Sequence, residues 1–161
     1  AGDEFTEDII DYMRREHNLL IGERTAEKIK INVGSAVMNL DNPPEPYAVN
    51  GRDLMTGIPR QIIIRYEETV GALDKSIMKI EEAVLKALEI TPPELSSDIY
   101  RTGLYLTGGG ALLRGLDKRL SLKTNLPVIV ANDPLRAVVR GTGIALKNTD
   151  RFSFLIDRKS L

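Results

Sequence analysis

The sequence predicts an α/β fold, and three observations support that prediction. The second part of the chain shows the order helix–strand–helix–strand–helix, whereas the first part shows helices followed by a short antiparallel pair of strands. The first part is therefore typical of a small α+β insertion into an α/β domain. The second part contains only two strands, which rarely form a stable sheet alone. We expect strands that precede Ala1 in a longer protein to complete that sheet.

The composition excludes several classes of site. The 161 residues suffice for one domain or two small subdomains, and they include no cysteine and one histidine, His17. Disulfides, thiolate zinc sites and multi-histidine metal sites are thereby excluded. We interpret His17 as a surface or helix-end residue rather than a base. The net charge of −1 indicates no nucleic-acid or polybasic membrane partner. No transmembrane stretch or signal peptide is apparent.

Two amphipathic helices are expected in the first part. The first begins near Asp3, and the second begins near Thr25, a residue type that caps helix N-termini. Acidic residues crowd the start of the first helix, which the helix dipole explains without catalysis. The apolar positions recur every three or four residues, namely Phe5, Ile9, Ile10 and Met13 in the first helix and Ala26, Ile29, Val33 and Ala36 in the second.

Two strands follow these helices. Residues 39–46 are rich in Asn and Pro and predict a loop, after which strands are expected at 46–49 and 61–65. The pair Asn50-Gly51 is a turn signal, and the connection extends beyond a minimal hairpin to Gly57.

The second part opens with the longest predicted helix, residues 68–90. Its apolar residues, spaced by three or four, indicate a helix packed on a core rather than a coiled coil. Thr91 and the two prolines after it predict a short helix to about Ile99, with Thr91 as its N-cap. Strands are expected at 103–106 and 126–130. A last helix should begin at Asp133-Pro134, where Gly141 and Gly143 would permit close packing.

Three consecutive glycines, Gly108, Gly109 and Gly110, lie where the first of these strands should turn into a helix. Glycine lets the backbone take positive φ and lie close to a ligand. The amides at a helix start favour negative charge and donate hydrogen bonds to a ligand. The triplet therefore indicates a nucleotide cradle, although a tight turn without a ligand would use the same residues.

A dinucleotide site is an alternative interpretation of the same turn. Gly108 and Gly110 fit the first two positions of the G-x-G-x-x-G pattern, but Leu113 occupies the third. Asp133 follows the next strand, near the place of a ribose-binding acid. NAD or FAD thus stays open as a cofactor, whereas Arg114 lacks the context of a P-loop lysine.

A second charged stretch covers residues 22–30. Glu23, Glu27 and Lys30 fall on adjoining turns of one helix face, at a spacing that suits salt bridges. The spacing alone favours a solvated charged face. The functional alternative is that a glutamate accepts hydrogen bonds from ribose hydroxyls while a lysine stem flanks an adenine ring. No spacing in the chain identifies a nucleophile or a metal cage.

Together these segments resemble the MreB family of bacterial actins, over about residues 2–147. The resemblance covers only the C-terminal half of the family's chain, and the tail from Asn148 matches no family pattern. The matching segments occur in the family's order and spacing, and they are 2–5 (GDEF), 21–30 (IGERTAEKIK), 51–60 (GRDLMTGIPR), 91–99 (TPPELSSDI), 106–117 (LTGGGALLRGLD) and 133–135 (DPL).

The resemblance implies an actin-like ATPase fold, of which this chain would be the second, ribonuclease-H-like lobe with a small α+β subdomain inserted. Residues 1–7 and 68–133 would form part of the inner subdomain, and residues 8–67 the small outer subdomain. Residues 134–161 would provide a helix that returns to the missing first lobe, plus a tail.

By the same resemblance, two segments would clasp the adenosine of ATP, with Gly2 close by. Magnesium, the phosphate-binding hairpins and the hydrolytic residues would belong to the missing half, so we expect no ATP hydrolysis by this chain alone. The residues implied in binding are Gly108, Gly109, Gly110, Ala111 and Leu112 beside adenine and ribose, and Glu27, Lys28, Lys30 and Glu23 along the helix.

The expected function of the intact protein is a cytoskeletal one. It would assemble head to tail with copies of itself into cytoplasmic filaments beneath the inner membrane. These filaments would guide the wall-synthesis machinery and maintain rod shape, and membrane contact would use parts absent here. A fragment of a NAD- or FAD-binding enzyme, or an interaction module without a nucleotide site, remains the alternative.

Overall fold

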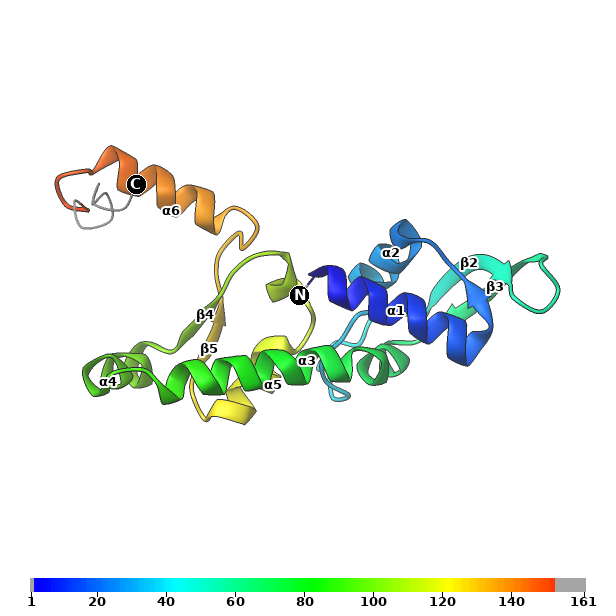
Figure 1. Cartoon of the computed structure of the whole chain (residues 1–161), viewed down its shortest axis with the longest axis horizontal. Helices are drawn as coiled ribbons and strands as arrows, with labels where there is room; N and C mark the ends of the chain where they lie inside the picture. Colours follow the sequence, from blue (N-terminus) through cyan, green and yellow to red (C-terminus); the bar gives the residue numbers. More distant parts are fainter. Residues whose placement is uncertain (1, 153–161) are drawn as a thin grey trace.

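The computed structural model describes residues 2–152 and shows a mixed α/β arrangement (Figure 1). An antiparallel sheet with its covering helices lies at one end, and a parallel strand pair lies nearer the other. In chain order the elements are α1 (Gly2–His17), β1 (Leu19–Leu20), α2 (Glu23–Val33), β2 (Tyr47–Asp53), β3 (Pro59–Ile64), α3 (Tyr66–Glu89), α4 (Pro93–Thr102), β4 (Leu104–Leu106), the 3₁₀ helix η1 (Gly109–Leu112), α5 (Leu116–Thr124), β5 (Val128–Val130) and α6 (Ala137–Lys147).

The main core lies between the antiparallel sheet and helices α1, α2 and α3. The sheet has the order β1-β2-β3, with Leu19 opposite Asp53 and Tyr47 opposite Ile64. Helix α1 contacts α2, α3 and β1, and α2 also contacts β2. The predicted apolar faces are confirmed, because the buried residues include Phe5, Ile9, Met13, Ala26, Ile29, Val33, Leu73 and Ile77.

The predicted start of α2 at Thr25 is wrong by two residues. The helix begins at Glu23 with Gly22 as its N-cap. The Gly22 carbonyl accepts hydrogen bonds from the amides of Thr25 and Ala26, each at 3.0 Å, so the helical bonding pattern starts before Thr25. Only residues 21 and 22 separate the end of β1 at Leu20 from the helix.

The Asn50-Gly51 pair does not form the hairpin turn that its sequence indicates. Both residues lie inside β2, where Gly51 pairs with Arg60. The chain turns instead at residues 54–57, where the Asp53 Oδ1 atom accepts the amide of Met55 at 2.8 Å. Gly51 is needed for close approach of β1, because a Cβ there would lie 2.7 Å from both the Leu19 Cγ atom and the Leu20 carbonyl oxygen.

Helix α3 begins with a side-chain contact and a buried hydroxyl. The Glu68 Oε1 atom accepts the amide of Arg65 at 2.9 Å. One turn later, the Thr69 hydroxyl is buried and donates to the Val33 carbonyl at 2.9 Å, which fixes α3 against the end of α2. Toward its other end α3 runs past the antiparallel sheet, and Ile90 just after the helix is exposed (Figure 1).

Thr91 does not cap α4. Its hydroxyl donates to the Ala87 carbonyl at 2.7 Å, so it completes the end of α3 instead. Pro92 occupies the N-cap of α4, and Pro93 is the first helical residue. The helix ends at Thr102 rather than Ile99, and Gly103 follows in a left-handed conformation with φ 81°.

The parallel pair β4–β5 matches the two predicted strands, with Tyr105 opposite Ile129. The last helix begins later than expected, at Ala137, because Asp133 (φ 50°) starts a turn in which its carbonyl accepts the amide of Arg136 at 3.0 Å.

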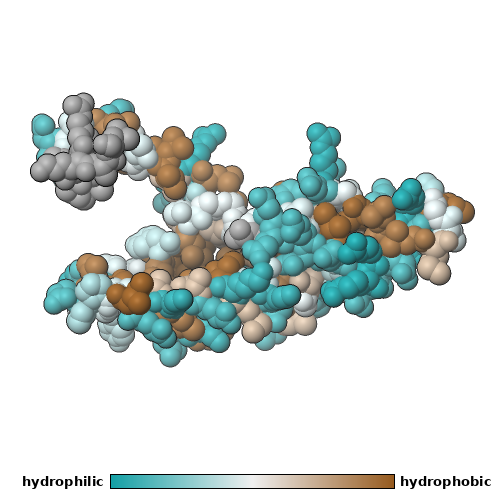
Figure 2. All heavy atoms as spheres, viewed as in Figure 1, coloured by the Kyte–Doolittle hydropathy of each residue, from teal (hydrophilic) through white to brown (hydrophobic). Residues whose placement is uncertain are grey.

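Helix α6 extends away from the rest of the described structure (Figure 1). None of its residues is buried, and Val139 is 74% exposed. A Cβ on Gly141 or Gly143 would meet no atom within 4 Å, so the expected close packing does not occur within residues 2–152. Brown apolar side chains gather on this helix in the space-filling view (Figure 2). No helix in the described range is long and apolar enough to cross a membrane.

Arg119 links α5 to α3 through two carboxylates. Its guanidinium lies 2.8 Å from Asp74 and 2.6 Å from Glu81, and the Glu81 side chain is only 8% exposed. A carboxylate buried to that degree needs a compensating partner, because desolvation otherwise disfavours its charged form.

We therefore expect Arg119→Met to lower the free energy of unfolding by roughly 3 kcal/mol, since it leaves Glu81 buried without its cation. Urea titration followed by circular dichroism would measure the change. Lys118→Met is the matched control, because Lys118 pairs with an exposed Asp41 and should matter little. Equal effects of the two substitutions would contradict this assignment.

Gly51→Ala and Gly71→Ala should have opposite effects on stability. The first forces a methyl group against β1 and should cost about 1–3 kcal/mol. The second places a methyl group in open space within α3 and should add about 0.5–1 kcal/mol. Thermal and urea unfolding of both variants would test this, and a stabilising Gly51→Ala would refute the close approach of β1.

Candidate functional site

The glycine triplet forms an open turn after β4. Gly108 has φ 81°, and its amide donates to the Pro134 carbonyl at 2.8 Å, which joins the turn to the segment after β5. A Cβ on Gly108 or Gly110 would meet no atom within 4 Å, and one on Gly109 would only touch Leu135 at 3.4 Å. Within the described residues, the backbone of the triplet is therefore accessible to a ligand.

The expected α-helix directly after the triplet is wrong. A single turn of 3₁₀ helix, η1, begins within the triplet at Gly109 and ends at Leu112, and α5 begins only at Leu116. Leu112 is consequently 56% exposed rather than on a buried helix face, whereas Leu113 is buried. The helix is interrupted at Gly115, whose left-handed backbone (φ 73°) is incompatible with a continuous α-helix. A Cβ there would also lie 2.4 Å from Val37 Cγ2, so the position requires glycine. Ala111 is buried beneath the turn.

Lys30 is held by contacts within the protein. Its Nζ atom lies 3.0 Å from the Gly2 carbonyl, 3.2 Å from the Thr6 hydroxyl and 2.6 Å from the Glu27 Oε2 atom. An ammonium has three N–H donors, and these three acceptors occupy them. The Lys30 side chain is 16% exposed, so a ligand would meet its methylene stem rather than a free ammonium.

Glu27 is the carboxylate of this network. Its hydrogen bond with Lys30 holds the pKa of Glu27 below its usual value, and a hydrogen bond from Thr6 at 3.1 Å adds to that effect against the opposing desolvation. The side chain is 48% exposed and keeps its charge at neutral pH. Glu27 can therefore accept further hydrogen bonds. Lys28 and Glu23 are exposed on the same helix.

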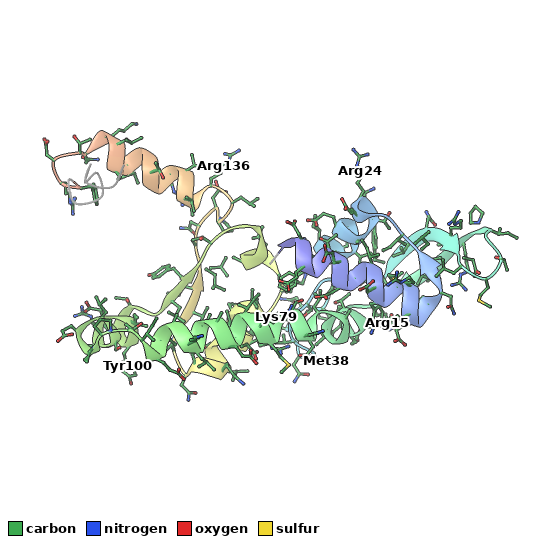
Figure 3. All side chains as sticks on the ribbon, viewed as in Figure 1. Arg15, Arg24, Met38, Lys79, Tyr100 and Arg136 are labelled. Carbon is green, nitrogen blue, oxygen red and sulfur yellow. The ribbon has the colours of Figure 1, made fainter. Side chains whose placement is uncertain are left out.

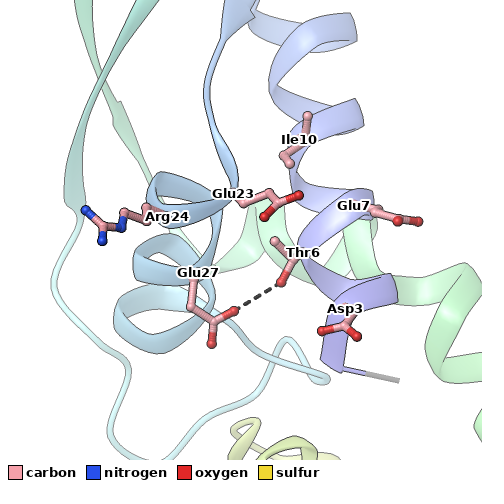
Figure 4. A pocket seen from close by; sticks show the side chains of 7 residues that line it. All are labelled: Asp3, Thr6, Glu7, Ile10, Glu23, Arg24 and Glu27. Atoms are coloured by element: carbon pink, nitrogen blue, oxygen red, sulfur yellow. Dashed lines mark hydrogen bonds between the residues drawn. The ribbon is translucent and has the colours of Figure 1, made fainter.

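A hollow of about 320 Å³ lies between the first half of α1 and the first half of α2 (Figure 4). Glu23 and Glu27 face it, whereas Arg24 points away from α1 toward solvent (Figures 3 and 4). Of the predicted site residues, only these two glutamates line the hollow. The complete lining is Asp3, Thr6, Glu7, Ile10, Glu23, Arg24 and Glu27.

The structure joins the two predicted segments at the C-terminal end of α2. The Arg114 Nη1 atom donates to the Ile31 carbonyl at 2.9 Å, and the Arg114 carbonyl accepts the amide of Ala36 at 2.8 Å. The segment that follows the triplet is therefore a direct neighbour of the C-terminal end of α2. Glu27 lies seven residues before Gly34, roughly 10 Å along the helix.

Sequence reasoning missed Thr6 and Arg114. Thr6 lies one turn after Gly2, among acidic residues that the helix dipole already explains, so no sequence pattern singled it out. Arg114 had a usable signal, because it is the first basic residue after the triplet. Its contacts with α2 nevertheless span 83 positions of sequence for Ile31, which no local pattern reveals.

The described part of the chain forms no cluster of metal ligands. No group of three or more His, Asp or Glu side chains within residues 2–152 could hold a metal ion. His17 ends α1, as expected, and its Nε2 atom lies 2.8 Å from Glu68. The nearby Tyr12 hydroxyl is half-buried and donates to the Glu68 Oε2 atom at 3.2 Å. Partial burial, together with the charge of Glu68, raises the pKa of Tyr12 to about 12.

Comparisons with known proteins are consistent across sequence and structure. Residues 1–153 match the MreB/Mbl protein family. The chain is 47% identical over 151 residues to the cell shape-determining protein Mbl of Bacillus subtilis, covering 94% of this chain and 45% of that protein. It is 48% identical over 150 residues to the cell shape-determining protein MreB of Escherichia coli K12, covering 93% and 43% respectively.

Solved structures show the same relation. The crystal structure of MreB5 of Spiroplasma citri bound to AMPPNP matches with a TM-score of 0.87 and 40% identity, over 94% of this chain and 45% of that chain. A MamK mutant bound to AMPPNP shares the fold, with a TM-score of 0.67 and 20% identity over 84% of this chain and 41% of that one. The chain thus spans less than half the length of its relatives, and it belongs to the MreB/Mbl family of actin-like proteins.

Proposed function

We propose that this chain is the second lobe of an ATP-binding, filament-forming actin-like protein that maintains rod cell shape by guiding wall synthesis. The chain would supply the adenosine side of the nucleotide cleft. The observation that carries this proposal is the junction of the open glycine turn with the end of α2 through Arg114. Relatives at 47% and 48% identity are cell shape-determining proteins, and a similar solved structure holds AMPPNP.

The residues present suit an adenosine ligand. The backbone of Gly108, Gly109 and Gly110 would lie against adenine and ribose, since within the described range a Cβ there would meet no atom within 4 Å except Leu135 beside Gly109. Ala111 and Leu112 would continue that border. This part of the site would bind by shape and backbone contact rather than by charge.

The α2 face would supply the polar contacts. The Glu27 carboxylate would accept hydrogen bonds from ribose hydroxyls, because one of its oxygens already binds Lys30 and Thr6 and holds the group in place. The stem of Lys30 would flank the base, with Lys28 and Glu23 at the edge of the site. The same arrangement favours ATP over the NAD or FAD alternative, because the third glycine of the dinucleotide pattern is replaced by the buried Leu113.

The chain would act together with a first lobe. The division into residues 1–7 with 68–133, residues 8–67, and residues 134–161 remains part of this proposal, and residues 153–161 lie outside the described residues. Exposed apolar side chains on α6, including Val138 and Val139, and on the small parallel sheet, including Tyr105 and Ile129, suit burial against further strands and helices. Magnesium would be held mainly by that other lobe, and this chain alone would not hydrolyse ATP.

Assembly would follow from closure of the two lobes. A ligand that binds both lobes favours the closed arrangement by its differential affinity for it. A filament that grows open-ended needs head-to-tail contacts between different surfaces of successive copies. We place these filaments in the cytoplasm at the inner face of the cell membrane, with membrane contact through parts outside this chain.

Titration of Mg-ATP into the chain combined with a family first lobe tests the proposal. We expect binding that needs both halves, with NAD as the control. Gly109→Val should weaken Mg-ATP binding by at least about a hundredfold, because the added side chain would enter the space left for adenosine. The fold should be unchanged, since the structure has room at this position.

Gly71→Val is the matched control, because a Cβ on Gly71 meets no atom within 4 Å and Gly71 lies on α3, away from the triplet. Calorimetry measures the affinities, and circular dichroism checks the fold. Unchanged affinity in folded Gly109→Val protein would refute the role of the triplet. Preference for NAD would instead support the dinucleotide alternative, and no nucleotide binding by a folded complex would support a pure interaction module.

A further inference from the structure

Arg114 occupies the C-terminal end of α2, although it belongs to the segment after the glycine triplet. Its Nη1 atom lies 2.9 Å from the Ile31 carbonyl and 3.4 Å from the Gly34 carbonyl. The last carbonyls of a helix lack partners within the helix, and a cation there also interacts favourably with the helix dipole. The guanidinium therefore completes an end of α2 that the helix cannot complete itself.

The backbone of Arg114 makes a second connection to the same segment. Its carbonyl accepts the amide of Ala36 at 2.8 Å and lies 3.4 Å from the Ser35 hydroxyl. Ser35 and Arg114 also form an isolated parallel β-bridge, and Ser35 is fully buried. One residue thus holds the end of α2 through its side chain and the following residues through its main chain.

The two segments fit closely at two glycines. A Cβ on Gly34 would lie 3.1 Å from Leu113 Cδ1 across the contact, and also 2.2 Å from the Lys30 carbonyl oxygen of its own helix. A Cβ on Gly115 would lie 2.4 Å from Val37 Cγ2. The separation of residues 113–115 from residues 34–37 is therefore set by direct contact, with little freedom to vary.

We propose that Arg114 is a positioning residue of the nucleotide site, which sets the distance between the glycine turn and the charged face of α2. This inference rests on the proposed function. Arg114 acts through its neighbours: Leu112 lies two residues before it, and Lys30 lies in the helical turn that its guanidinium completes. Loss of the guanidinium contacts would let Glu27 and the triplet move apart, and both ATP and ADP would lose the same adenosine contacts.

The test compares Arg114→Met with Arg101→Met in the protein completed by its first lobe. Arg114→Met keeps the aliphatic stem and removes the donors. Arg101 is the matched control, because it is 79% exposed on α4 and pairs only locally with Asp98. We expect Arg114→Met to raise the Kd of Mg-ATP and of Mg-ADP by the same factor, about tenfold, and Arg101→Met to change neither.

Two further measurements separate positioning from general stability. Amide hydrogen exchange should accelerate at residues 31–36 and 109–113 of Arg114→Met without nucleotide, while the α1 and β2 amides keep their protection. Arg114→Lys retains the charge and one donor for the Ile31 carbonyl, so it should restore part of the affinity. If Arg114→Met does not fold, the comparison of Arg114→Lys with wild type provides the measurement, with a smaller loss expected.

Unchanged nucleotide affinity in a folded Arg114 variant would overturn the inference, and so would an equal loss in Arg101→Met. A lower melting temperature with unchanged Kd would likewise overturn it, since Arg114 would then be structural only. Failure of the wild-type complex to bind ATP would instead contradict the proposed function, so the two failures are distinguishable.

Discussion

The contact of the C-terminal end of α2 with α3 and with the segment after the glycine triplet is the constraint on which the rest of the structure depends. The buried Thr69 hydroxyl binds the Val33 carbonyl, and its oxygen accepts the amide of Ser35 at 3.2 Å. Arg114 binds the same end of α2 from the other side. Val33 and Ser35 are buried here, so their polar groups need partners within the protein. The partners of this helix end come from two segments, namely α3 and the residues after the glycine triplet. Helix α2, the long helix α3 and the segment after the triplet are thereby held together.

The charged face of α2 depends on this constraint as well. Lys30 binds the start of α1 and Glu27 together, so the carboxylate is fixed by a network that begins in a different helix. Because Glu27 is already held in place, it would lose less side-chain entropy when it binds a ligand. The exposed apolar side chains of α6 and of the parallel pair lie outside this network. The chain thus has a part around α1–α3 whose apolar residues are buried, and a part, α6 with the parallel pair, whose exposed apolar side chains suit contact with further protein.

The sequence predicted elements well where one period repeats over several turns. The burial of Phe5, Ile9 and Met13 on α1 follows from spacing alone, because helical geometry places such residues on one face. Predictions were wrong where a residue that is typical of a local turn or cap instead contacts another element of the structure. Gly51 serves the approach of β1 rather than a turn, and the Thr91 hydroxyl binds the end of α3 rather than the start of α4. Gly115 likewise interrupts the helix expected after the triplet through its left-handed backbone, and the nearby Val37 leaves no space for a side chain there.

By itself the sequence determined the α/β class, the glycine turn after a strand, the charged face of one helix, and the resemblance to bacterial actins that the comparisons confirmed. These features are local, since composition, spacing and motif order carry them. Only the tertiary structure decided that Lys30 is engaged within the protein and that Arg114 joins the triplet to α2. Hydrogen bonds between residues 83 positions apart depend on how helices pack, and packing is set by the shapes of many side chains at once rather than by any one segment.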